Sequence, residues 1–264
     1  MSQSTRHPAG APRYAAGPRQ SGFTLIEMMI AITMALFLIA GVLGLVISMS
    51  RSFRTEDQLT QTQETERFML SVLNNTIHPA GYFVDPVGTP VATALPASTV
   101  ATADGTPYVA GQSISGTGGG TGNGASSDTI NVRFQSAAGD GLMNCQGDTN
   151  TTTGTVVWSS SFAVNAQNQL TCVVSTNGAA PPAGTPLVLV DNVYKLKAMY
   201  CVDTDADGAA DTYMTAAQVT TAGLWSSVVS VQLTITLIDL INNTATTPKY
   251  LPPLVQTINL MNNS

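Results

Sequence analysis

The chain has 264 residues, a net charge of −6 and only 10% charged residues, where average soluble domains carry about 25%. Without residues 1–22, which hold three arginines and no acid, the net charge falls to −9, which argues against a nucleic-acid-binding protein because such proteins need clustered positive charge. The length allows one main domain with an appendage, and the low charge with many small polar residues is typical of an exported, β-rich protein.

The first predicted element is an apolar helix that follows the basic leader. Residues 28–50 carry no charge, and about 20 apolar residues suffice to cross a membrane. By the positive-inside rule the leader, residues 1–22, stays cytoplasmic and the rest of the chain lies outside. No small-residue cleavage site follows Ser50, so an ordinary secretory signal is not favoured. The sequence predicts a single-pass membrane anchor over residues 23–50.

The helix is expected to continue past the membrane segment to about residue 77, a length of roughly 80 Å at 1.5 Å per residue. Its second half, residues 51–78, has one apolar face. Three residues of that face recur at a spacing of four: Met69, Leu73 and Ile77. His78 precedes a proline, which disfavours helical backbone and ends the helix. Residues 79–264 are predicted to form a β-rich globular domain.

Residues 86–128 are poor in charge and rich in Pro, Ala, Thr and Gly, which predicts long loops with room for one short strand. Their glycine-rich part, residues 115–128, lacks the Gly-Lys-Ser/Thr ending of a phosphate-binding loop and is predicted to be a mobile surface loop.

Strand signals dominate the remainder of the chain. Apolar and polar residues alternate with period two in several segments, and one further segment resembles a small hairpin. These segments are residues 129–135, 193–202, 227–240 and 254–260, with the hairpin over residues 155–170. The predicted fold class is α+β, with one long N-terminal helix packed on an antiparallel β-sheet.

The junction before the apolar helix, GFTLIE over residues 22–27, resembles the processing motif of type IV pilins and type II secretion pseudopilins. The resemblance implies that prepilin peptidase cuts between Gly22 and Phe23, that the new amino group of Phe23 is methylated, and that Glu27 helps to recruit subunits. A buried carboxylate costs roughly 2.5–3.5 kcal/mol at the centre of a membrane helix. The N-terminal amine of a neighbouring subunit would offset that cost. A plain signal anchor with an incidental Glu27 is the alternative.

Later segments resemble PilW-type minor pilins within the type IV pilin-like fold. The similar parts are TERF at residues 65–68, PAGY at residues 79–82, and residues 200–237 with an aspartate-rich turn, a tryptophan and a long strand. The resemblance implies a subunit that primes pilus assembly and is incorporated at or near the tip. Its partners would be prepilin peptidase, other minor pilins, the major pilin and the inner-membrane assembly platform. The alternatives are a J-type minor pseudopilin of a type II secretion system and a tip-exposed adhesive pilin.

An aspartate-rich segment, DTDADGAAD over residues 203–211, is a candidate calcium loop. Its carboxylates occupy positions 1, 3, 5 and 9 of an EF-hand-like loop. They belong to Asp203, Asp205, Asp207 and Asp211. Position 12 is Met214 instead of a bidentate glutamate, so a full EF-hand is excluded. The sequence leaves open a partial Ca²⁺ site with a dissociation constant of about 0.1–1 mM and a plain hairpin turn.

Three cysteines predict one disulfide and one free thiol in an oxidising compartment. Cys145 and Cys172 flank the predicted hairpin, and a bond between them would contribute roughly 3–4 kcal/mol on the chain-entropy model. Pairing of Cys201 with either partner is the alternative. There is no CxxC pair, which argues against a structural zinc site.

The chain is not expected to be an enzyme. It has two histidines, of which His7 lies in the leader and His78 precedes a proline at the end of the helix. No HExxH motif occurs, and the tight group of carboxylates is the calcium candidate itself.

Overall fold

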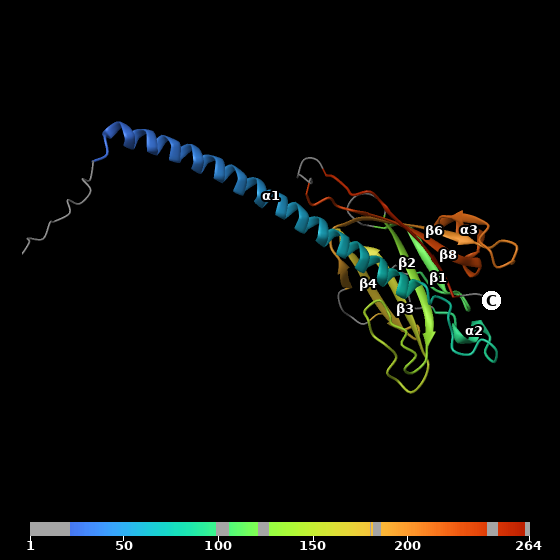
Figure 1. The fold of residues 1–264 in the computed structure, drawn as a ribbon. Coiled ribbons are helices and arrows are strands. Elements are labelled where there is room, and N and C mark those ends of the chain that lie inside the picture. Colours follow the sequence, from blue (N-terminus) through green and yellow to red (C-terminus); the bar gives the residue numbers. More distant parts are fainter. Residues whose placement is uncertain are drawn as a thin grey trace, which may run out of the picture. The chain divides into compact units, whose positions relative to one another are not determined.

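The computed structural model describes residues 22–98, 106–120, 127–179, 181, 186–241 and 248–261. The chain divides into two compact units, Met1–Arg54 and Thr55–Ser264. The long helix α1, Leu25–Ile77, contributes to both of them (Figure 1).

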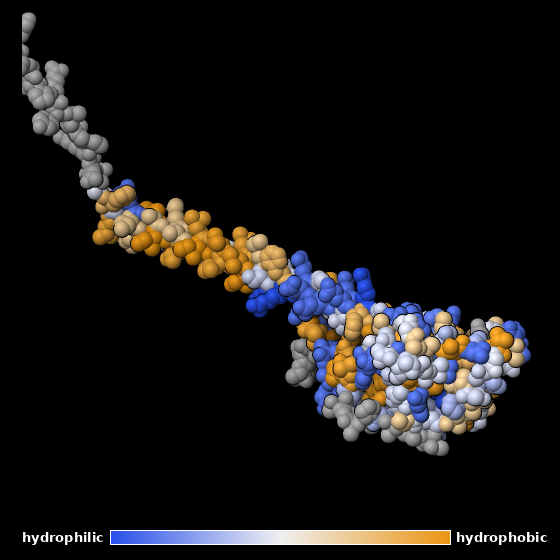
Figure 2. Space-filling view, turned by 90° about the horizontal axis from the view of Figure 1, so that it is seen from below, coloured by the Kyte–Doolittle hydropathy of each residue, from blue (hydrophilic) through white to orange (hydrophobic). Residues whose placement is uncertain are grey.

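In the first unit, α1 exposes apolar side chains around its whole circumference. An apolar stretch of 18 residues in this helix has none of its residues buried within the described structure. The helix is long and apolar enough to cross a membrane. Figure 2 shows this part of α1 as an almost continuous hydrophobic surface that gives way to hydrophilic residues further along the helix. A helix that is apolar on every side requires an apolar environment, so its partner is a membrane or other apolar helices.

In the second unit, the last turns of α1 belong to the core of the globular domain. Met69, Leu73 and Ile77 are at most 1% exposed and pack with residues of both sheets. Their spacing of four residues places them on one face, which confirms the predicted amphipathic half. The helix ends where it was expected: the His78 N–H donates to the Asn74 carbonyl, and turn residues follow.

The described strands form two antiparallel sheets (Figure 1), where the sequence predicted one. The five-stranded sheet contains, in spatial order, β1 (Ile114–Gly120), β2 (Ser127–Ser136), β3 (Val156–Val164), β4 (Leu170–Thr176) and β5 (Leu187–Val190). The four-stranded sheet contains β7 (Thr212–Met214), β6 (Val193–Val202), β8 (Val228–Leu237) and β9 (Leu254–Asn259). Short helices are α2 (Val91–Ala94) and α3 (Ala216–Ala222), with a 3₁₀ turn at Trp225–Ser227.

The two sheets share one core and are linked by buried polar contacts at the start of β2. The Asp128 carboxylate accepts hydrogen bonds from the Lys197 ammonium at 2.8 Å and from the Ala198 N–H at 3.0 Å. The Ser127 hydroxyl accepts from the Leu196 N–H at 3.2 Å. These contacts join β2 to β6, so the predicted α+β architecture of a long helix on antiparallel sheet is confirmed, with two sheets in place of one.

The glycine-rich segment corrects one expectation. Residues 114–120 form strand β1, paired with β2, whereas a mobile loop was predicted; residues 121–126 lie outside the described part of the chain. Close packing explains one glycine of this strand. A Cβ at Gly116 would collide with the Tyr200 hydroxyl of β6 and lie 2.6 Å from the Thr129 carbonyl oxygen. Glycine is therefore required where β1 meets the aromatic ring of the other sheet.

Candidate functional site

The predicted processing junction lies at the start of the described chain. Phe23 is 87% exposed, and a Cβ built at Gly22 would meet nothing within 4 Å. Residues 22–24 precede the first helical residue, Leu25. The junction therefore lies outside the helix and is unobstructed by the described residues, which fits a peptidase substrate. The preceding leader residues lie outside the described part of the chain.

Glu27 closes a capping box with Thr24 at the first turn of α1. One carboxylate oxygen of Glu27 accepts from the Thr24 N–H and from the Thr24 hydroxyl, both at 3.0 Å, and the Glu27 N–H donates to that hydroxyl at 3.3 Å. The negative charge thus lies at the positive end of the helix dipole. Sequence reasoning missed Thr24, although the T-x-x-E spacing was a sufficient signal for it.

The aspartate-rich loop brings three of the four predicted ligands together. One carboxylate oxygen from each of Asp203, Asp205 and Asp211 lies within 4.8 Å of the others. Asp207 is not part of this group; its carboxylate accepts from the Ala209 N–H at 2.7 Å. Three converging carboxylates are the oxygen donors that Ca²⁺ prefers, so these residues fit the ion.

Hydrogen bonds within the loop also hold its carboxylates in place. Asp203 accepts from the N–H groups of Ala206 at 2.7 Å and Gly208 at 2.8 Å. Asp211 accepts from the Thr204 hydroxyl and N–H, each at 2.7 Å. A hairpin turn stabilised by its own aspartates accounts for the loop as well, so calcium binding stays a prediction.

The electrostatics of this loop differ between two of its acids. Hydrogen bonds from the hydroxyl and the N–H of Thr204 lower the pKa of Asp211. For Asp205, the hydrogen bond from the Asp207 N–H favours the charged form, but repulsion from the neighbouring carboxylates of Asp207, Asp211 and Asp203 and slight desolvation outweigh it and raise the pKa. A cation would relieve this repulsion.

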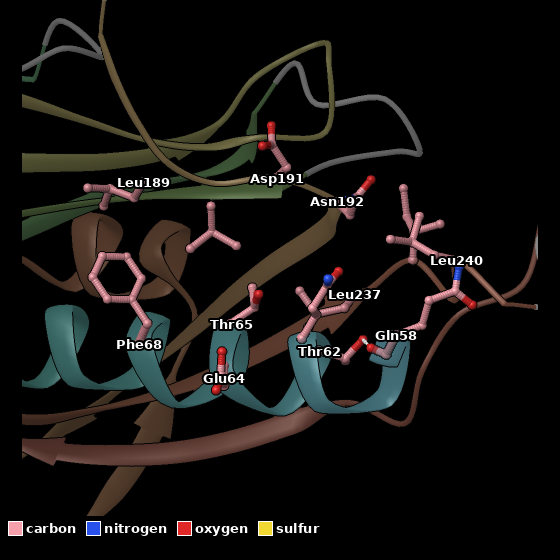
Figure 3. Close-up of a pocket in the computed structure, with 13 residues that line it drawn as sticks. Gln58, Thr62, Glu64, Thr65, Phe68, Leu189, Asp191, Asn192, Leu237 and Leu240 are labelled. Atoms are coloured by element: carbon pink, nitrogen blue, oxygen red, sulfur yellow. Dashed lines mark hydrogen bonds between the residues drawn. The ribbon is translucent and has the colours of Figure 1, made fainter. Parts of the chain in front are cut away.

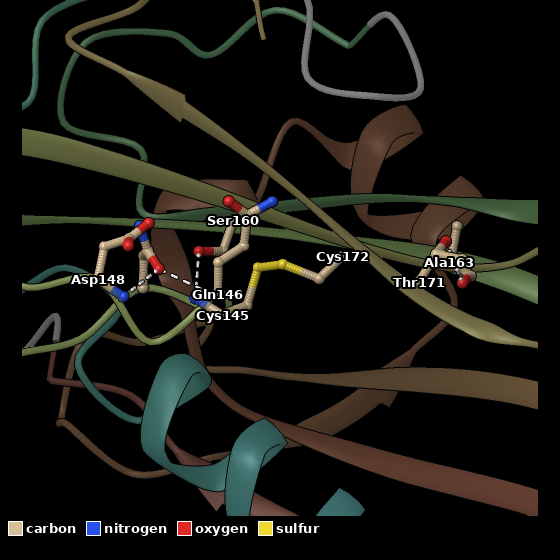
Figure 4. Close-up of a disulfide and its surroundings, with 8 residues drawn as sticks. Cys145, Gln146, Asp148, Ser160, Ala163, Thr171 and Cys172 are labelled. Atoms are coloured by element: carbon tan, nitrogen blue, oxygen red, sulfur yellow. Dashed lines mark hydrogen bonds between the residues drawn. A yellow bond between two sulfur atoms is a disulfide. The ribbon is translucent and has the colours of Figure 1, made fainter. Parts of the chain in front are cut away.

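Cys145 and Cys172 form the predicted disulfide, with Cα atoms 6.2 Å apart (Figure 4). The bond ties the loop after β2 to strand β4, and both cysteines belong to the core. The Cys145 N–H also donates to the Ser160 hydroxyl of β3. Cys201 is free and buried, so the alternative pairings through Cys201 are not observed.

His78 has a structural contact at the end of α1. Its Nδ1 donates to the Asn259 carbonyl oxygen at 2.7 Å, and its own carbonyl accepts from the Met261 N–H at 3.0 Å. The residue therefore ties the helix end to the C-terminal strand β9.

A groove of about 470 Å³ lies between the second half of α1 and the turns that follow β5 and β8 (Figure 3). Phe68 of α1 and Leu240 after β8 are about half exposed in it, at 52% and 53%. Glu64 lies on the helix wall and Asp191 on the strand wall (Figure 3). The groove mixes apolar surface with a polar rim, which is typical of a contact surface between proteins.

Two family models match the chain. The model described as type IV pilus-assembly protein W matches residues 157–263, which cover most of the β-domain from β3 to β9. The model described as the prokaryotic N-terminal methylation motif matches residues 17–43, which include the junction, Glu27 and the first half of the apolar helix. No curated protein matches the chain.

The matches agree with the geometry at both ends of the molecule. The methylation motif coincides with the unobstructed junction and the exposed apolar helix, which fit a pilin anchored in the inner membrane. The pilin family implies processing by prepilin peptidase and contact with other pilus components. The two matches together support a PilW-type minor pilin of the type IV pilus.

Proposed function

We propose that this minor pilin takes part in priming the assembly of the type IV pilus and is incorporated at or near the filament tip. The supporting observation is the first half of α1, which is apolar on all sides and 0% buried within the chain. Such a helix is stable in lipid before assembly and among other apolar helices afterwards. The subunit acts structurally and catalyses nothing itself.

Assembly would begin at the processing junction. Prepilin peptidase cuts between Gly22 and Phe23, and the new amino group of Phe23 is methylated. Residues 23–50 hold the subunit in the inner membrane, the leader of residues 1–22 having faced the cytoplasm. Residues 51–78 and the domain of residues 79–264 lie in the periplasm and later on the cell surface.

Glu27 would then recruit a neighbouring subunit. Among the described residues, Thr24 supplies the hydrogen bonds to the Glu27 carboxylate, through neutral donors. A charged amine is the stronger partner, because it adds a Coulombic attraction between two ionised groups, which is large in an apolar environment. The amine of another pilin, approaching along the membrane, can therefore compete with the capping box. Other minor pilins and the major pilin supply such amines, and the inner-membrane assembly platform would bring them together.

A clean deletion strain tests this role, with sheared surface pilin and secreted proteins measured against the parent. We expect a large drop in sheared pilin, restored by the intact gene, with secreted proteins unchanged. Unchanged pili with lost secretion would point to a type II pseudopilin. Unchanged pili with lost surface attachment would point to an adhesive subunit. Either of these results would contradict the proposal.

A further inference from the structure

A buried guanidinium group lies on strand β2, on the face turned away from the core residue Val132. Arg133 is only 2% exposed. The strand alternation predicts an outward side chain there, but a covering segment made of residues 95–96 and 108–112 lies over it. Its nitrogen atoms donate to the backbone carbonyls of Gln112, Pro96 (2.6 Å), Leu95 (3.2 Å) and Val109 (2.7 Å).

These contacts satisfy four of the five N–H donors of the guanidinium without neutralising its charge. Within the described residues, no carboxylate forms an ion pair with Arg133; the ion pair found there joins Lys197 to Asp128. The guanidinium also stacks on the Tyr108 ring, 4.4 Å from its centroid, which adds weak attraction. Burial lowers the pKa of Arg133 to about 10, so the group still carries its charge at neutral pH. A buried charge without a counter-charge is costly.

A cavity of about 90 Å³ adjoins this charge. Ser159 lines it and lies directly opposite Arg133 in the β2–β3 register. Asn177 lines it too. Its Oδ1 accepts from the Val157 N–H at 2.8 Å, so the amide NH₂ group points away from the Val157 N–H and remains able to donate. Gly178 also lines the cavity, close to Ser98. A Cβ at Gly178 would lie only 3.0 Å from the Ser98 hydroxyl oxygen.

The cavity therefore combines one positive charge with hydrogen-bond donors. A guanidinium has five N–H groups, and the four hydrogen bonds of Arg133 leave one without an acceptor among the described residues. The Ser159 hydroxyl and the Asn177 NH₂ add further donors. Since a water molecule takes up about 30 Å³, the volume suits one small ion with a water molecule and excludes a large organic anion.

We propose that the cavity beside Arg133 binds one small monovalent anion of chloride size, which neutralises the guanidinium and holds the covering segment on the five-stranded sheet. The site is separate from the assembly helix and does not depend on the proposed role in priming. It predicts a stability of the domain that depends on which anion is present, beyond general screening.

The test uses the full chain in a nonionic detergent, in sodium chloride or in sodium gluconate at equal ionic strength. Gluconate is too large for the cavity, so general salt effects cancel. We expect the thermal midpoint to be about 2–4 °C higher in chloride. The ³⁵Cl NMR line of chloride should broaden in the presence of the protein. Equal midpoints with no broadening would overturn the proposal.

Two serine variants locate the chloride effect without removing Arg133, whose loss would leave carbonyls unsatisfied. Ser159→Asp places a carboxylate opposite the guanidinium and should abolish both chloride effects. Ser175→Asp, one strand further away opposite Ser159, should keep them. Full broadening in Ser159→Asp would contradict the assignment. Asp104 lies outside the described residues. Broadening that arises only in Asp104→Asn would show that the chain supplies its own anion, which overturns the proposal.

Discussion

The two halves of α1 are continuous in sequence but are stabilised in different ways. From Leu25 to about residue 50 the side chains are apolar on every side and exposed, and the described residues supply nothing to cover them. From Met69 to Ile77 a single apolar face is buried against the sheets. The first half depends on an external partner, and the second depends on its own domain. Mutations in the two halves should therefore affect different measurements.

The largest expected effect comes from the buried half. Leu73→Ala removes a side chain that is 0% exposed and leaves a cavity between α1 and the sheets, which should cost about 2–5 kcal/mol of unfolding free energy. Leu36→Ala, at a leucine that is 61% exposed in the first half, is the matched control and should leave the unfolding of the domain unchanged. Denaturant unfolding of the full chain in detergent measures both. An equal loss in the two variants would break the comparison.

The disulfide sharpens the same comparison, because it stabilises the domain alone. Replacing both Cys145 and Cys172 by alanine should lower the unfolding free energy by about 3–4 kcal/mol on the chain-entropy model for a separation of 27 residues. The protein should still fractionate with the membrane. Cys201→Ala, at the buried free thiol, serves as the control and should cost clearly less. A smaller loss in the double variant than in this control would contradict the account.

Close packing between the sheets gives a further, smaller effect. Gly116→Ala places a Cβ against the Tyr200 hydroxyl and the Thr129 carbonyl, and such overpacking costs about 1–3 kcal/mol. Gly118→Ala in the same strand is the control, since the nearest atom, an Asp128 carboxylate oxygen, is 3.7 Å away. Thermal unfolding of both variants tests this, and only Gly116→Ala should lower the thermal midpoint clearly. Equal melting of the two would mean that β1 can move away from β6 at no cost.

Much of this architecture follows from local patterns in the sequence. The amphipathic half of α1, strands β2, β6, β8 and β9, and the pairing of Cys145 with Cys172 were all predicted, because each depends on periodicity or on spacing along the chain. The family resemblance was confirmed by matches at both ends of the chain.

The missed features depend on contacts between distant segments. Strand β1 requires glycine at position 116 because Tyr200 of the other sheet lies against it, and a glycine-rich segment alone predicts a loop. Arg133 occupies an outward position of β2, and the sequence gives no sign that a distant segment covers it. The division into two sheets has the same origin, since alternation shows which residues are buried but not which strands pair.

The smallest expected effect concerns the aspartate-rich loop. Binding of Ca²⁺ at a few millimolar should increase the unfolding free energy by about 1–2 kcal/mol. This increase is measured as a rise in the thermal midpoint. The gain should shrink as the pH falls, because the raised pKa of Asp205 makes this carboxylate protonate early. Asp203→Asn should abolish the gain and Asp207→Asn, outside the converging group, should keep it. An unchanged midpoint with Ca²⁺ would leave the loop as a turn held by its own hydrogen bonds.

The most direct test of the central claim is the piliation of a strain that carries Glu27→Ala. Leader cleavage and membrane localisation should be normal on immunoblots, while sheared surface pilin should fall toward the level of the deletion strain. Glu56→Ala, at an exposed acid in the second half of α1, should produce pili like the parent. Normal piliation with Glu27→Ala would contradict the recruitment of neighbouring subunits through this carboxylate.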